Sequence, residues 1–230
     1  MFAKNWDDVI AAGVRLQQLL PDAVLVGGTA SAAHASHRIS LDDDHVLTDL
    51  RERFDDVLAH LEQSEGWVTA RVNRPVLILG SLDGIETGIR QLIRRLPLEV
   101  EAIDTPAGPL RVPTLEEMLR IKAWLVLRRN ATRDYLDVVG LTDRLGVDAA
   151  ARVAVGLDAF YEDQQGPGGE RIATQLAKQL AEPAPYDRAD VDLRVYRQLA
   201  QRWHDWNDVQ IACRSLAHRM LDRIAAGDAR

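Results

Sequence analysis

Two acidic residues, Asp42 and Asp44, follow a pair of adjacent glycines near the start of the chain. An apolar run over 23–26 ends in Gly27-Gly28, and small residues come next. This pattern predicts a strand, a glycine turn, a short helix and a second strand with acids at its beginning. Residues i and i+2 of a strand point to the same side, so we expect Asp42 and Asp44 to project together.

Such an arrangement could bind a metal ion and a phosphate side by side. Two carboxylates on one face repel each other unless a cation lies between them, and Mg²⁺ prefers oxygen ligands, including substrate phosphates. Gly27 and Gly28 let backbone N–H groups converge at the start of a helix, where a phosphate can bind. Together these features favour nucleotidyl transfer. Taken singly, Gly-Gly is an ordinary turn, and a run of aspartates is an ordinary solvated loop or helix cap.

The order of these residues resembles a known signature. Gly27-Gly28-Thr29, a helix, and then His37-Arg38-x-Ser40-x-Asp42-x-Asp44 is similar to the motif of the DNA polymerase β-like nucleotidyltransferase superfamily. More narrowly, it resembles the AbiEii-type nucleotidyltransferases, the toxin component of type IV toxin–antitoxin systems. Further matches lie in Val112–Lys122 and Arg128–Asp137, so the resemblance covers about the first 140 residues.

The resemblance implies a role for each matching residue. The residues it assigns to the nucleotide are Gly27, Gly28, Thr29, Ser31, Arg38, Ser40 and Lys122. Asp42 and Asp44 would bind Mg²⁺, with Mn²⁺ as an alternative, and the catalytic set would be Asp42, Asp44, Lys122 and Asp134. The nucleoside triphosphate (NTP) is then a substrate, a tRNA or protein hydroxyl is the acceptor, and an antitoxin is a candidate partner.

Enzymes of this superfamily commonly carry a third carboxylate on a later strand. Glu86, in Ile85-Glu86-Thr87, lies at the best-placed position, and Glu101 is the other candidate. Exposed glutamates on strands are common. The sequence therefore predicts Glu86 as a third metal ligand from a loose match.

Lys122 falls within the apolar stripe of a helix that begins near Thr114. An inward-facing lysine is seldom left unpaired, because burying a lone ammonium is costly. It is therefore either the structural partner of a carboxylate or a point charge for a triphosphate, and the resemblance favours the second role. The resemblance also puts Asp134 beside Lys122. On the next helix along the chain, which carries Asp134, the residues Arg133 and Asp137 lie one turn apart and could form a surface ion pair.

Composition limits the class of protein. The 230 residues are 47% hydrophobic and 27% charged, as in ordinary soluble globular proteins. The single Cys213 excludes an intramolecular disulfide and a cysteine zinc site, and we expect no disulfide-linked partner. No apolar run is long enough to span a membrane, and the polar N-terminus is unlike a signal peptide. These features favour a cytoplasmic protein with no membrane partner.

Charge is distributed unevenly along the chain. The net charge of −7 argues against a general nucleic-acid coat, although 111–133 is rich in arginine. This asymmetry suits an anionic substrate near the middle of the chain. A solvated arginine-rich helix would have the same composition.

We expect an α+β fold, with a mixed sheet flanked by helices and a C-terminal helical bundle. The catalytic core would span 1–112, and a helical domain over 113–230 would complete the cleft. In the first part the patterns predict helices over 5–20 and 50–62 and strands near 67–72, 75–79, 85–92, 98–103 and 110–112. In the second part they predict a helix that opens at Thr114 and further helices over 148–161, 170–181, 192–202 and 205–226, with a loop over 164–169. Trp203 and Trp206 are expected to pack these helices together, with His204 incidental.

Three functions remain open on the sequence alone. The first is Mg²⁺-dependent transfer of a nucleotide to RNA or protein by a growth-inhibiting toxin. The second is modification of a small molecule, as in aminoglycoside-modifying relatives. The third is a non-catalytic module that binds a nucleotide or a partner and has kept the fold.

Overall fold

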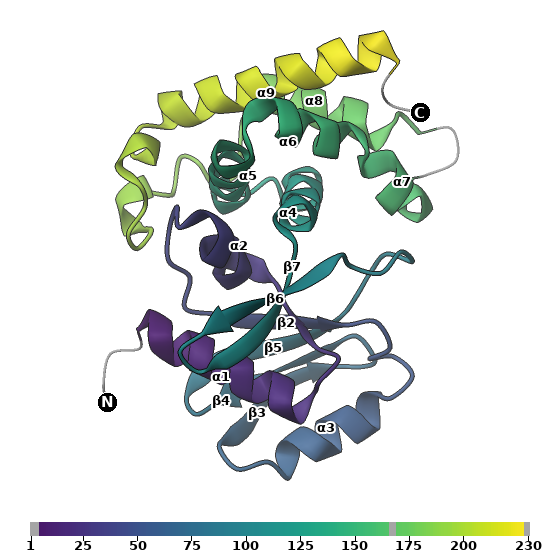
Figure 1. Cartoon of the computed structure of the whole chain (residues 1–230), viewed down its shortest axis with the longest axis vertical. Coiled ribbons are helices and arrows are strands. Elements are labelled where there is room, and N and C mark those ends of the chain that lie inside the picture. The colour runs from purple at the N-terminus through teal and green to yellow at the C-terminus, as the bar shows by residue number, and fades with distance from the viewer. Residues whose placement is uncertain (1–4, 166–168, 228–230) are drawn as a thin grey trace. The chain divides into compact units, whose positions relative to one another are not determined.

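In the computed structural model of the protein, residues 5–165 and 169–227 are described. The chain forms two compact units (Figure 1). The sheet unit consists of Met1–Ala30, Ser40–Ile93 and Pro97–Thr114, and the helical unit consists of Ser31–Ile39, Arg94–Leu96 and Leu115–Arg230. Compared with the expected ranges 1–112 and 113–230, the short segments 31–39 and 94–96 group with the helical unit. The expected domain boundary itself stays a prediction.

The sheet unit contains a mixed sheet together with helices. Its elements are α1 (Trp6–Leu19), β1 (Val24–Leu25), the first turn of α2 (Gly27–Ala35), β2 (Asp43–Leu47), α3 (Phe54–Glu62), β3 (Trp67–Asn73), β4 (Leu77–Leu82), β5 (Ile85–Gln91), β6 (Val100–Thr105) and β7 (Gly108–Pro113). Five strands pair in the order β1-β2-β5-β4-β3, and β2 runs parallel to β5 while the other neighbours are antiparallel. β6 and β7 form a separate antiparallel pair. The predicted α+β class is confirmed.

Local sequence signals explain where several elements begin and turn. The side chain of Asn5 accepts a hydrogen bond from Asp8 N, and Asn5 N donates to the Asp8 carboxylate, which is the capping box at the start of α1. Asp83 and Gly84 have φ angles of 51° and 78°, as the tight hairpin between β4 and β5 requires. The strands predicted near 98–103 and 110–112 are present as β6 and β7, which pair antiparallel as a hairpin. α3 begins at Phe54, four residues later than the apolar period from Leu50 suggests.

The two faces of the five-stranded sheet differ. Buried side chains of β2, β4 and β5 pack against α1 and α3 in one core cluster, which includes Leu16, Leu47, Phe54, Leu61, Ile78 and Ile89. Burial alternates along β2, so Asp43 and His45 face this core while Asp44 faces the other side. The strand pattern therefore separates neighbouring acids between a dry face and an accessible face.

β3 is the outer strand of this sheet. Its register against β4 shifts between Thr69 and Arg71, and residues 70–73 are exposed on both faces. A free edge of this kind carries backbone groups that no neighbouring strand pairs.

The helical unit consists of helices and short 3₁₀ turns. Its elements are the remainder of α2, α4 (Leu115–Arg129), α5 (Thr132–Leu145), α6 (Val147–Val155), α7 (Leu157–Tyr161), η1 (Glu162–Gln164), α8 (Ile172–Ala181), η2 (Leu193–Val195), η3 (Gln201–Trp203) and α9 (Trp206–Ala226). The ring of Trp124 stacks on Tyr161 at 4.5 Å, and Trp206 meets Tyr135 edge-on at 5.9 Å. Trp203 is 2% exposed. Trp203 and Trp206 therefore pack among the helices, as predicted.

Two helix predictions need correction. The segment 192–202 is not a helix but contains two separate 3₁₀ turns, because its buried residues Leu193 and Leu199 come too sparsely for a helical face. The predicted helix over 148–161 is divided at Gly156 into α6 and α7. The predicted loop over 164–169 falls partly outside the described residues.

Within residues 5–165 and 169–227, no helix combines the length and the apolar character needed to cross a membrane.

Cys213 gives a direct test of the helical core. Burial raises the pKa of its thiol to about 12. Because the thiolate is the reactive form, the native protein should react with a disulfide reagent at pH 8 roughly a thousandfold more slowly than the urea-unfolded chain. Cys213 is the chain's single cysteine, so the released chromophore reports this site alone. Equal rates in the native and unfolded states would contradict the packing of α9.

Candidate functional site

The glycine turn lies where the sequence predicts it. β1 ends at Leu25 and α2 begins at Gly27. The φ angle of Gly27 is 77°, a backbone conformation that residues other than glycine rarely adopt. The predicted strand, glycine turn and helix are confirmed. Thr29 is fully buried, and its hydroxyl donates to the backbone oxygen of Asp42 at 2.6 Å. That bond ties the first turn of α2 to the segment that leads into β2.

The carboxylate of Asp44 lies between two glycines. A Cβ atom on Gly27 would come within 3.3 Å of Asp44 Oδ2, and one on Gly88 would come within 2.6 Å of Oδ1. Gly88 is the register partner of Asp44 on β5. The Asp44 side chain is 33% exposed, and Arg90 Nε lies 3.5 Å from Oδ1. The glycines leave room beside this carboxylate that a methyl group would fill.

The other predicted metal ligands are spread along the sheet unit. Asp42 is exposed and immediately precedes β2, and Glu86 is exposed on β5. Glu101 lies on β6, in the other sheet. Among the described residues, no three His, Cys, Asp or Glu side chains are gathered so that they could hold a metal ion. The pair Asp42 and Asp44 nevertheless fits Mg²⁺, which commonly binds one or two carboxylates and completes its shell with water and phosphate oxygens.

Asp43 and His45 form a buried polar cluster on the opposite face, which the sequence does not reveal. Both are fully buried, and His45 Nδ1 lies 3.5 Å from Asp43 Oδ1. Burial, reinforced by the charge of Asp44, raises the pKa of the Asp43 carboxyl well above its usual value. Burial lowers the pKa of His45 to about 3, so its imidazole is neutral. Gln17 Nε2 lies 3.3 Å from His45 Nε2 and links the cluster to α1.

In the helical unit, Lys122 belongs to a cluster centred on Asp137. Its Nζ lies 2.7 Å from Asp137 Oδ2. Arg38 Nε lies 2.7 Å from Oδ1 and Nη2 lies 3.0 Å from Oδ2, and His37 Nε2 is 2.8 Å from Oδ1. Lys122 and His37 are each 2% exposed, Arg38 is 7% exposed and Asp137 is fully buried. One carboxylate thus receives two cations and a histidine.

The charges in this cluster depend on one another. Burial alone would raise the pKa of the Asp137 carboxyl, but Arg38 and Lys122 hold it well below its usual range. Burial lowers the pKa of Lys122, and Asp137 offsets part of that effect. In this arrangement Lys122 has the carboxylate partner that one of its two predicted roles requires. Its contact with a nucleotide phosphate stays a prediction.

Two predicted pairings of α5 need correction. The carboxylate that contacts Lys122 is Asp137, whereas Asp134 pairs with Arg129, with Nη2 2.7 Å from Oδ1. Asp137 is also not a surface partner of Arg133, because it is fully buried and Arg133 is exposed. Residues three apart share one helix face, so the sequence could not decide which acid would meet the lysine. What the sequence did indicate was that Lys122 faces inward and therefore needs an anionic partner.

The remaining predicted nucleotide contacts are Ser31, Ser40 and Gly28. Ser31 is fully buried in the helical unit, and Ser40 and Gly28 are half-buried in the sheet unit. Their predicted contacts with a nucleotide, like those of Gly27, Thr29 and Arg38, stay predictions.

Comparison with solved structures identifies the fold. The chain is similar to the solution structure of the antibiotic-resistance factor ANT(2'')-Ia, with a TM-score of 0.51 and 12% identity over 68% of this chain and 92% of that chain. A crystal structure of ANT(2'')-Ia in complex with adenylyl-2''-tobramycin gives a TM-score of 0.50 at 12% identity, covering 68% of this chain and 97% of that chain. The protein has the nucleotidyltransferase fold.

The relatives found by sequence comparison match only part of the chain. No protein-family model matches it. A heme uptake protein of Mycobacterium tuberculosis, MmpL11, is 37% identical over 130 residues, which is 56% of this chain and 13% of that protein. A mycolic acid-containing lipids exporter of Mycolicibacterium smegmatis, also named MmpL11, is 35% identical over 130 residues, again 56% of this chain and 13% of that protein. The chain therefore spans about an eighth of the length of these relatives.

The Asp137 cluster predicts a large stability effect. Asp137→Asn should lower the free energy of unfolding by about 3–5 kcal/mol, because it leaves Arg38 and Lys122 buried without their negative partner. Urea unfolding followed by circular dichroism measures the change. Asp143→Asn, which removes an exposed ion pair with Arg202, should cost less than about 1 kcal/mol and is the control. Equal effects of the two variants would contradict the assigned role of Asp137.

The lowered pKa of Asp137 predicts that the folded protein loses stability at low pH. Because the pKa of Asp137 is lowered in the folded protein, its contribution is fully present above the unfolded value, near 3.9, and is lost as the pH falls towards the folded value. The stability difference between the wild type and Asp137→Asn should therefore be constant from pH 7 to 5 and should shrink below about pH 4. Unfolding midpoints measured across that range check the sign. A difference that grew on acidification would be inconsistent with it.

Proposed function

We propose that the protein is a metal-dependent nucleotidyltransferase that moves a nucleoside monophosphate from an NTP to an acceptor hydroxyl. The observation that carries this proposal is the Asp44 carboxylate. It is partly exposed, flanked by Gly27 and Gly88, and lies two residues after the exposed Asp42 in a chain with the nucleotidyltransferase fold.

Each residue near that carboxylate has a proposed role. Gly27 and Gly28 present backbone N–H groups to the triphosphate at the start of α2, and Thr29 fixes the Asp42 segment against that turn. Asp42 and Asp44 hold Mg²⁺, or Mn²⁺ in its place. A bound metal ion lowers the pKa of the attacking hydroxyl and neutralises charge on the leaving pyrophosphate. Asp44 keeps its carboxylate accessible because the neighbouring positions are glycines.

The other candidates have the roles that the resemblance implies for them. Glu86 shares the accessible sheet face with Asp44 and is proposed as an outer ligand, reached through water. Lys122 and Arg38 would steady phosphate charge while held in place by Asp137. Ser31 and Ser40 are proposed nucleotide contacts, and Asp134 is proposed to assist the attacking hydroxyl.

The biological role that we propose is that of an AbiEii-type toxin in the cytoplasm. Its acceptor would be a tRNA or a protein hydroxyl, and an antitoxin would restrain it. The support is the motif Gly27-Gly28-Thr29 with Ser40-x-Asp42-x-Asp44.

Modification of a small molecule is the second candidate. It is favoured by the likeness to ANT(2'')-Ia, whose crystal structure holds adenylyl-2''-tobramycin. Aminoglycosides are polycations, and an acidic pocket would suit them. The pocket of the helical unit, described below, is lined by two arginines and one aspartate and is therefore not acidic. A non-catalytic binding module is the third candidate, and the lack of a gathered third carboxylate among the described residues supports it.

The proposal predicts that transfer depends on both aspartates. Purified protein with Mg²⁺, each α-³²P-labelled NTP, and either total tRNA, cell extract or an aminoglycoside should label one acceptor class. Asp42→Ala and Asp44→Ala should each lower the rate on the order of 1000-fold, because a metal ion supplies several kcal/mol of charge stabilisation. Asp56→Ala, which removes an exposed acid of α3, is the matched control and should keep the wild-type rate.

The outcomes separate the candidates. Label in RNA or in a protein band supports the toxin-like enzyme, and label in the aminoglycoside supports the second candidate. Saturable NTP binding without any transfer supports the binding module. Full activity in a folded Asp44→Ala protein would refute the metal-binding role of the pair.

A further inference from the structure

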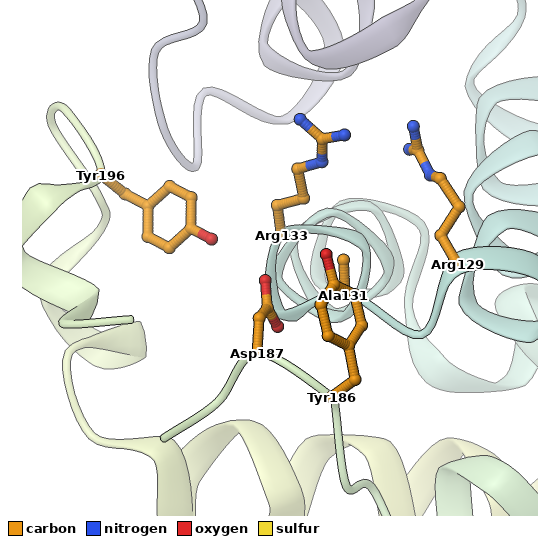
Figure 2. Close-up of a pocket in the computed structure, with 6 residues that line it drawn as sticks. All are labelled: Arg129, Ala131, Arg133, Tyr186, Asp187 and Tyr196. Atoms are coloured by element: carbon orange, nitrogen blue, oxygen red, sulfur yellow. The ribbon is translucent and has the colours of Figure 1, made fainter. Parts of the chain in front are cut away.

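The helical unit contains a pocket that the proposed reaction does not explain. Its volume is about 580 Å³, within the range of small-molecule sites. The lining residues are Arg129, Ala131, Arg133, Tyr186, Asp187 and Tyr196. Figure 2 shows that the two guanidinium groups extend to the same side and that the hydroxyl of Tyr196 points towards Arg133 and Asp187.

Hydrogen bonds fix the floor of this pocket to the corner between α4 and α5. Asn130, with a φ of 49°, donates from Nδ2 to Ala184 O at 2.9 Å and accepts from Tyr186 N at 2.9 Å. Asp187 Oδ1 accepts from Thr132 N at 2.7 Å and from Thr132 Oγ1 at 2.8 Å. The backbone of 184–187 is therefore held before any ligand arrives, which lowers the ordering cost of binding.

Of the two arginines that line the pocket, one is available to bind an anionic ligand. Arg129 is paired with Asp134, and Asp187 is occupied by the start of α5. Arg133 is exposed and forms no ion pair within the part of the chain that the structure describes. An arginine in this position has its planar fork of donors free for a phosphate or carboxylate.

Two tyrosines supply the other half of the site. Tyr186 is 73% exposed, which is unusual for a large aromatic residue on a fixed backbone. The guanidinium of Arg38 lies 5.8 Å from the ring centre of Tyr196, which connects the pocket to the Asp137 cluster. Burial raises the pKa of Tyr196, so its hydroxyl remains a hydrogen-bond donor at neutral pH.

We propose that this pocket binds a nucleotide unit, with the phosphate on Arg133 and the base stacked on Tyr186. The phosphate also receives the Tyr196 hydroxyl. A free mononucleotide and the terminal nucleotide of an RNA present the same chemistry, because both pair a flat base with a phosphate. The site lies wholly in the helical unit, and its occupancy does not depend on Asp42, Asp44 or a metal ion.

Calorimetric titration of the full chain tests the proposal. The probes are the four nucleoside 5′-monophosphates and a single-stranded RNA tetramer, all in the presence of EDTA so that metal-dependent binding is absent. Arg133→Ala should weaken binding roughly tenfold or more, as expected for the loss of a charged hydrogen bond. Tyr186→Ala should weaken it about tenfold, as expected for the loss of one stacking ring.

Arg144→Ala is the matched control. Arg144 is exposed on α5, the helix that carries Arg133, but does not line the pocket. Its removal should change the Kd less than about twofold, because general charge attraction alone is screened at 0.15 M salt. An equal loss of affinity in Arg133→Ala and Arg144→Ala would mean that binding depends only on net charge, and would overturn the proposal.

The remaining outcomes are decisive as well. Binding of the monophosphates and the tetramer with equal affinity supports a site for one nucleotide unit, and binding of the tetramer alone assigns the source to RNA. No binding of either probe overturns the proposal, as does binding that Arg133→Ala and Tyr186→Ala both leave unchanged. Pocket binding by a protein without transferase activity would refute the proposed function but not this site, and the converse result would refute the site alone.

Discussion

The helical unit depends on a single buried carboxylate. Asp137 on α5 contacts Lys122 of α4 as well as His37 and Arg38, so one side chain joins two consecutive helices to a segment about 100 residues earlier in the chain. Two buried cations without it would face a desolvation cost that no packing contact offsets. The same carboxylate orients Arg38, which in turn lies against Tyr196 of the pocket. The Asp137 ion pair therefore reaches one wall of the pocket, the ring of Tyr196.

In the sheet unit, neighbouring acidic residues are separated from each other instead of being paired with buried cations. Asp43 and Asp44 are neighbours in the chain, yet the strand turns one into the core and leaves the other accessible. The buried acid has a raised pKa and contacts His45, while the accessible acid lies between glycines. A run of three aspartates is thus not one acidic patch. Each carboxyl has its own environment, and the proposed chemistry uses the two that remain solvated.

The sequence predicts elements whose causes are local. Asn5 and Asp8 cap α1, Asp83-Gly84 fixes a hairpin, and the glycines after β1 start α2, because each effect acts within a few residues. The partner of Lys122 was not predictable, since two acids of α5 were equally eligible and only the packing of α4 on α5 distinguishes them. The pocket was not predictable either, because it joins residues 129–133 to residues 186–196 through loop backbone contacts. The apolar residues of 192–202 are spaced as in a helix, but only Leu193 and Leu199 are buried, and the segment forms 3₁₀ turns instead.

The free edge of β3 affects how copies of the protein meet one another. Pairing between molecules along a sheet edge needs a flat run of unpaired backbone groups in a regular register. The register shift at Thr69–Arg71 twists that run, and Arg71 adds a charge that intermolecular stacking would have to desolvate. The register shift and the charge of Arg71 both disfavour pairing between copies of the protein along this edge.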